Sequence, residues 1–139
     1  MATTTATITL ASADMMDNNI SVSNTATLTT AGTDTGISKT TGLATRTFTS
    51  ASNVVLLDSG AGIAADVTTD KSAKVFIKNT NDRGDGTKYV LVLLTAVEIG
   101  RLYGGDWMFI PWSGGSGKDI EVTPSDTTET TLEYMVFFE

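Results

Sequence analysis

Hydroxyl side chains are the most abundant groups in this 139-residue chain that could do chemistry. A Ser or Thr nucleophile needs a general base with a pKa near 7, and His usually supplies it. The chain contains no His and no Cys. A Ser–Lys pair stays formally open, but the few Lys residues fall in loops or at strand edges, where a solvated face explains them. The sequence therefore predicts a protein that is not an enzyme and that has no catalytic residue.

Sixteen Asp and Glu residues are scattered along the chain. A glycoside hydrolase needs two carboxylates that face each other across a cleft, and the sequence singles out no such pair. A carboxylate-dependent glycan hydrolase therefore remains only as the enzyme-class alternative.

The segment Asn79–Thr87 is rich in oxygen donors and partly resembles a calcium loop. An EF-hand needs a bidentate Glu at its twelfth position, and counting from Asn81 reaches Val92 inside an apolar stretch. A hairpin turn with Gly84 and Gly86 at positive φ accounts for the same residues. We therefore expect a turn here, with neither metal nor cofactor.

Two other short motifs have simple explanations. Arg83-Gly84-Asp85 matches the tripeptide of integrin ligands, but three residues recur by chance in many hairpin loops. The run Gly114–Gly117 lacks the Gly-Lys-Ser/Thr ending of a phosphate-binding loop. Both are interpreted as turns.

The densest aromatic segment is Asp106–Trp112. In a strand, Trp107 and Phe109 would lie on one side and Met108, Ile110 and Trp112 on the other. Aromatic residues dominate both cores and interface hot spots. A strand between two layers would make all of these residues core, whereas an edge strand would turn one face toward another chain. We expect more core than interface, with a mixture of the two. Pro111 must lie at an end or on an edge strand. The predicted interface residues are Arg101, Tyr103, Trp107, Phe109 and Trp112.

The elements that would position these residues are strands. Alternating or continuous apolar patterns predict them at 5–10, 20–28, 43–48, 54–57, 73–78, 88–96, 98–103, 106–112, 119–123 and 131–138. The segments 73–78 and 88–96 are predicted to form a hairpin with a long loop. Turn signals recur every eight to twelve residues or so without a helical period, so the predicted fold is all-β, an antiparallel β-sandwich or barrel.

Large side chains are distributed unevenly along the chain. Residues 1–50 are dominated by Thr, Ala, Ser, Asn and Gly, whereas nearly all aromatic residues follow residue 75. We therefore expect a Thr-rich N-terminal arm or extended strands at 1–50 and a sandwich or barrel core at 51–139. The stretch 29–41 has almost no large apolar residue and is expected to be a flexible loop or an arm that orders against a partner.

The formal net charge of −7 would repel a phosphate backbone, so nucleic acid is not an expected partner. No apolar run approaches the length of about 20 residues that spans a bilayer. The first residues lack the basic and apolar regions of a signal peptide. We expect a soluble protein without a membrane partner or an export signal.

The segments Glu98–Trp112 and Thr131–Phe138 resemble small virion-associated proteins of tailed bacteriophages, notably those that infect marine cyanobacteria and other marine bacteria. The resemblance covers residues 73–138 and includes no catalytic motif. It implies a capsid-decorating or cement protein, although similar small β-proteins also occur in tails, necks and head fibres.

The resulting expectation is a non-enzymatic virion protein, made in the host cytoplasm and located on the outer capsid surface. It would bind and stabilise the shell of the major capsid protein through its N-terminal region and one sandwich face, together with other copies of itself. The alternative is a tail, neck or fibre component with a receptor- or glycan-binding β-sandwich.

Overall fold

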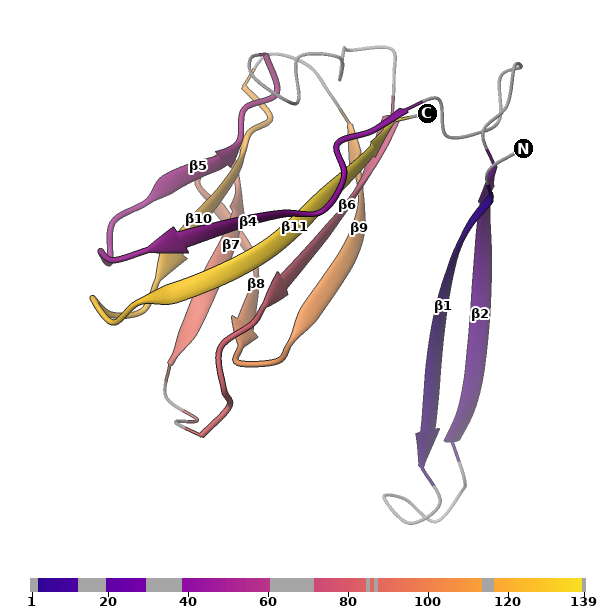
Figure 1. Ribbon diagram of the computed structural model, residues 1–139, viewed down its shortest axis with the longest axis horizontal. Coiled ribbons are helices and arrows are strands. Elements are labelled where there is room, and N and C mark those ends of the chain that lie inside the picture. Colours follow the sequence, from indigo (N-terminus) through magenta and orange to yellow (C-terminus); the bar gives the residue numbers. More distant parts are fainter. Residues whose placement is uncertain are drawn as a thin grey trace. The chain divides into compact units, whose positions relative to one another are not determined.

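Two separate groups of strands make up the structure, a computed structural model that describes residues 3–12, 20–29, 39–60, 72–84, 86, 88–113 and 117–138 (Figure 1). The strands are β1 (Thr3–Ser12), β2 (Ile20–Thr29), β3 (Lys39–Thr40), β4 (Ala44–Phe48), β5 (Val54–Leu57), β6 (Ser72–Asn79), β7 (Tyr89–Leu94), β8 (Val97–Tyr103), β9 (Trp107–Ser113), β10 (Ile120–Pro124) and β11 (Thr130–Phe138). These described residues contain no helix, and so none long and apolar enough to cross a membrane. The all-β prediction is confirmed.

The second group is a sandwich of two antiparallel sheets. In the five-stranded sheet β11 lies between β6 and the pair β3 and β4, and β9 forms the far edge. Figure 1 shows the yellow β11 running between β4 and β6. The four-stranded sheet has the order β5-β10-β7-β8. The sandwich form of the prediction is therefore the one that the structure adopts.

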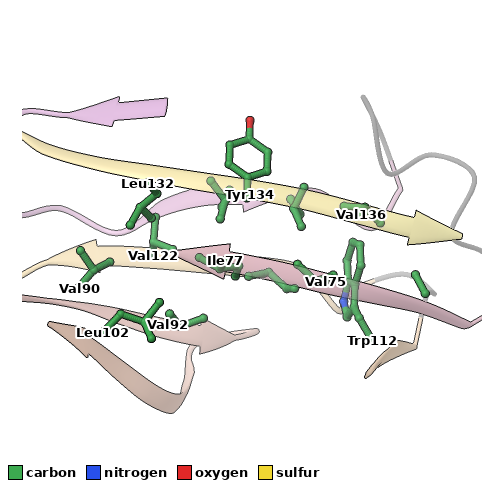
Figure 2. Close-up of a cluster of buried hydrophobic side chains, with 14 of the residues drawn as sticks. Val75, Ile77, Val90, Val92, Leu102, Trp112, Val122, Leu132, Tyr134 and Val136 are labelled. Carbon is green, nitrogen blue, oxygen red and sulfur yellow. The ribbon is translucent and has the colours of Figure 1, made fainter. Parts of the chain in front are cut away.

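The core lies between the two sheets, and strand alternation selects its residues. In β11 the side chains of Leu132, Tyr134 and Val136 are buried, and in the opposite sheet those of Val90 and Val92 are completely buried. Figure 2 shows these side chains gathered together, with Trp112 at one end of the cluster. Each fully buried aliphatic side chain stabilises the fold by about 1.5–3 kcal/mol, so this cluster accounts for the stability of the sandwich.

The boundary between the two groups lies between Ser38 and Lys39. Residues 39–50, which the sequence assigned to the N-terminal arm, belong to the sandwich, because β3 and β4 both pair with β11. Phe48 is buried in the core at the end of β4. The predicted partner-dependent stretch 29–41 lies outside the described residues from 30 to 38.

The predicted hairpin of 73–78 with 88–96 is wrong. Its strands, β6 and β7, belong to different sheets: β6 pairs with β11 and β9, whereas β7 pairs with β10 and β8. Two alternating strands joined by a polar segment have the same sequence pattern whether they pair as a hairpin or lie in different sheets joined by a crossover. The segment after Asn79 is therefore a crossover between the two sheets.

A buried asparagine holds this crossover in place. Asn79 is 2% exposed, and its Nδ2 donates to the Leu102 carbonyl at 3.0 Å while its Oδ1 accepts from the Asn81 amide at 3.1 Å. Its backbone amide donates to the Asp106 carbonyl, and its carbonyl accepts from the Gly105 amide. Because both backbone groups and both side-chain atoms are bonded, Asn79 joins the crossover to the β8–β9 turn at little desolvation cost.

The β7–β8 turn lacks the usual turn residues. Thr95 and Ala96 have φ angles of 49° and 63°, the left-handed region that normally requires Gly or Asn in a two-residue hairpin. Hydrogen bonds from neighbouring segments hold the turn: the Thr95 amide donates to the Asp119 carbonyl at 3.0 Å, and the Ala96 amide to Glu121 Oε2 at 3.2 Å. The strained turn is thus stabilised by contacts distant in sequence.

Replacing Ala96 with glycine is expected to stabilise the sandwich by about 0.5–1 kcal/mol, because glycine adopts positive φ without the Cβ clash that alanine suffers. Chemical denaturation measures the change. Ala44→Gly in β4 is the matched control and should destabilise by a similar amount, since glycine weakens an ordinary strand. A loss of stability on Ala96→Gly as large as the loss on Ala44→Gly would contradict this explanation.

Candidate interaction surfaces

The structure separates the five predicted interface residues among three places. Trp107 and Phe109 lie on the outer face of the five-stranded sheet. Arg101 and Tyr103 lie on the outer face of the four-stranded sheet, since Leu102 between them points into the core. Trp112 is buried between the sheets. The five residues therefore do not form one surface.

Trp112 belongs to the core. It is 2% exposed, and its indole Nε1 donates to the Lys118 carbonyl at 2.7 Å. Met108 and Ile110, on the same side of β9, also pack against the core. The strand thus has a core side and an outer side, as its alternation suggested, and Trp112 is on the inner one.

The outer face of the five-stranded sheet carries an apolar cluster that we call the aromatic face. It comprises Phe76, Trp107, Phe109, Met135 and Phe137. Met135, Phe76 and Phe109 are direct neighbours across β11, β6 and β9. The rings of Phe76 and Trp107 are 6.3 Å apart, and Phe109 meets Phe137 edge-on at 5.9 Å. The aromatic face is thus continuous across three strands.

This face is unusual for the outside of an antiparallel sheet, which is normally polar where it meets water. Trp107 is 47% exposed, Phe76, Phe109 and Met135 are each half-buried, and Phe137 is buried. Lys74, Lys78 and Glu133 supply the charges on the same side of the sheet. Contiguous apolar surface rimmed by polar groups marks an interaction site more often than chance exposure does. The aromatic face is therefore the leading candidate.

Three residues of the aromatic face, namely Phe76, Met135 and Phe137, were missed as interface candidates. A signal was present in the sequence. Phe76 occupies the polar side of an alternating strand between Lys74 and Lys78, and Met135 and Phe137 occupy the side of β11 opposite Leu132 and Val136. Large apolar residues on both sides of a strand indicate two contact layers.

The outer face of the four-stranded sheet has a different character. Tyr89 and Tyr103 meet edge-on at 5.5 Å, and the Arg101 guanidinium lies 4.9 Å from the centre of the Tyr89 ring. Arg101 Nε also donates to Glu98 Oε1 at 2.9 Å, and this hydrogen bond together with the charge of Glu98 raises the pKa of Arg101 above its usual value. The Arg101 side chain is thus already engaged within its own sheet, which makes this face the weaker candidate.

Features on three outer strands of the sandwich oppose strand-to-strand association. Pro111 lies within β9, an edge strand, as its missing amide hydrogen required. The edge strand β8 has a bulge at Ile99, because Val92 pairs with Gly100 whereas Leu93 pairs with Glu98. Bulges and proline are the usual protections of exposed edges. Partners would therefore meet the faces of the sandwich rather than these edges.

On the third outer strand, β5, the Arg46 guanidinium covers an edge carbonyl. Its Nη1 donates to the Val55 carbonyl at 2.9 Å, and its guanidinium carbon lies 5.0 Å from the centre of the Phe48 ring. A side chain in this position occupies an acceptor that a foreign strand would need.

The N-terminal unit is the antiparallel hairpin of β1 and β2, ten residues in each strand. One face carries hydroxyls: Thr7 Oγ1 lies 3.1 Å from Thr25 Oγ1, and Thr9 pairs with Ser23. The opposite face has Ile8, Leu10 and Val22, which are 42%, 58% and 54% exposed. Leu10 pairs directly with Val22, and Asn24 opposes Ile8. We call this side the apolar hairpin face.

The loop that partly resembled a calcium site uses its groups internally. Asn79 and Asn81 bond to the backbone, and Arg83 forms an ion pair with Asp106 at 3.3 Å. Asp85 and Thr87 lie outside the described residues. In the part of the chain that the structure describes, no three Asp or Glu side chains come together in a way that could hold a metal ion.

Comparisons with protein-family models, curated proteins and solved structures find no match for this chain.

Proposed function

We propose that this protein is a non-enzymatic virion component that binds the outer surface of a bacteriophage capsid as a cement or decoration protein. The observation that carries the proposal is the aromatic face, a continuous apolar surface on a sheet side that normally faces water. The resemblance of residues 73–138 to small virion-associated phage proteins supplies the class of partner, the major capsid protein.

The surface properties of this protein are those that a cement protein needs. Such a protein stabilises a shell by adding contact area across neighbouring subunits, and aromatic side chains contribute much of the binding energy of protein interfaces. The protected edges keep many copies on one particle from aggregating through strand pairing. The net charge of −7 favours solubility and discourages binding of stray nucleic acid.

Purified protein is expected to bind expanded capsids that lack it and to raise the temperature at which they disrupt. Cosedimentation measures binding, and differential scanning calorimetry of the particles measures the stabilisation. Failure to bind any capsid, combined with localisation to the tail by electron microscopy, would overturn the proposal.

The double substitution Trp107→Ala with Phe109→Ala is expected to weaken capsid binding at least about tenfold, because it removes two aromatic contacts from the proposed interface. The control is Arg101→Ala with Tyr103→Ala on the opposite sheet face, which should leave the affinity unchanged. Titration of labelled protein onto capsids gives both values. Equal losses in the two variants would exclude the aromatic face as the contact surface.

The half-exposed Trp107 also favours a second candidate, a tail or fibre protein that binds glycans, because an exposed indole can stack on a sugar ring. Copy number separates the candidates: hundreds of copies per virion favour cement, and a few to tens favour the tail. Binding of a host glycan that Trp107→Ala abolishes would support this second function.

A further inference from the structure

We propose that the apolar hairpin face is the surface through which copies of this chain associate, with the hairpin of one copy packed face to face against the hairpin of another. The inference concerns self-association and does not depend on capsid binding. It rests on the exposure, pattern and charge of β1 and β2.

The exposed side chains are the first reason. Ile8, Leu10 and Val22 are each exposed by about half, although aliphatic side chains of this size are usually buried. A hairpin of two strands has no second layer to cover its apolar side, and such hairpins are at best marginally stable alone in water. Packing a second sheet on this side would bury all three side chains at once.

Charge favours a second copy as the covering layer. The segments Thr3–Ser12 and Ile20–Thr29 contain no charged residue, whereas the whole chain carries a net charge of −7. Two copies that associate through β1 and β2 therefore bring no charged side chain of these strands into the contact. An arbitrary acidic surface placed on the same side chains would lose hydration of its carboxylates.

The two-sided pattern is also self-complementary. When two identical hairpins pack through their apolar faces, the threonine ladders of Thr7 with Thr25 and Thr9 with Ser23 remain on the outside in water. The product is a small four-stranded sandwich, the usual arrangement of two stacked sheets. Its interior holds Ile8, Leu10 and Val22, with Asn24 beside Ile8. On two outer strands of the larger sandwich, β9 and β8, Pro111 and the Ile99 bulge oppose strand pairing between copies.

The test compares two double variants on the same strand. Ile8→Lys with Leu10→Lys places two charges on the apolar hairpin face, and Thr7→Lys with Thr9→Lys places the same two charges on the hydroxyl face. Both change the net charge equally and put lysine into β1 equally often. Analytical ultracentrifugation of the full chain, from about 1 µM to 1 mM, measures the dissociation constant.

We expect the unaltered chain to associate and the Ile8/Leu10 variant to dissociate at least about a hundredfold more readily. The Thr7/Thr9 variant should stay within about threefold of the unaltered chain. Near-ultraviolet circular dichroism should show the same folded sandwich in all three proteins.

Three results would overturn the inference. One is an unaltered chain that stays monomeric throughout the concentration range, which would assign the face to a different partner such as a capsid subunit. Another is association that survives in the Ile8/Leu10 variant. The third is equal weakening by both variants, which would point to general disruption of the hairpin. Capsid binding that persists in a dissociated variant would leave the proposed function intact.

Discussion

Replacing Trp112 with alanine is expected to lower the free energy of unfolding of the sandwich by about 3–5 kcal/mol. The substitution removes a side chain that is 2% exposed and lies among core residues of both sheets (Figure 2). It also leaves the Lys118 carbonyl without the indole hydrogen bond. Denaturant titration followed by far-ultraviolet circular dichroism measures the loss.

Two related variants separate the causes. Trp112→Phe keeps much of the ring volume but removes the hydrogen-bond donor, so it should cost less than Trp112→Ala. Trp107→Ala removes the same residue type from the aromatic face, where the side chain is 47% exposed, and should cost less than about 1 kcal/mol of stability. A large loss of stability at Trp107 together with a small one at Trp112 would reverse the assignment of the two faces of β9.

Gly104→Ala is expected to destabilise the sandwich by about 3 kcal/mol and to lower its melting temperature by more than about 10 °C. A Cβ at this position would lie 2.5 Å from the Asp82 carbonyl oxygen and 2.6 Å from that of Asn81. Both neighbours are backbone atoms, so the crossover from β6 to β7 would have to move. That movement would strain the hydrogen bonds joining Asn79 to Gly105 and Asp106.

Gly84→Ala is the matched control in the same crossover. A Cβ there meets no atom within 4 Å, and the residue is exposed, so the melting temperature should change by no more than a few degrees. Thermal unfolding of both variants side by side checks the pair. If Gly104→Ala melted like the unaltered chain, the close approach of the crossover to the β8–β9 turn would be refuted.

The strands themselves could be predicted from the sequence with good accuracy. The apolar run Val54–Leu57 coincides with β5, and the alternation of Thr131–Phe138 differs from β11 by one residue at its start. This works because successive side chains of an extended backbone point to opposite sides, a property of each strand alone. The lack of an amide hydrogen restricted Pro111 to a strand end or an edge strand, and it lies within the edge strand β9.

The β7–β8 turn could not be predicted, since Thr95 and Ala96 carry no turn signal of their own. Their conformation is held by Asp119 and Glu121, which lie more than twenty residues further along the chain. Local propensity is overridden here by contacts that exist only once β10 has paired with β7.

The candidate site likewise has features that the sequence predicts and others that depend on the tertiary structure. The aromatic segment, the absence of His and Cys and the uneven distribution of large side chains can all be recognised from the sequence alone. Pairing was not visible: β11 binds β4 on one side and β6 on the other, and β6 and β7 separate into different sheets. Alternation predicts that Trp107 and Trp112 lie on opposite faces of the strand, but it does not predict which of the two faces the core.

That choice depends on which strands lie alongside β9 and which sheet covers it. Once β6 and the four-stranded sheet are in place, Trp112 is enclosed and Trp107 stays exposed. The same assembly places Arg101 and Tyr103 on the opposite side of the sandwich from Trp107 and Phe109. A two-residue period is a local property of the backbone, whereas the identity of the inner face arises from contacts between segments far apart in the chain.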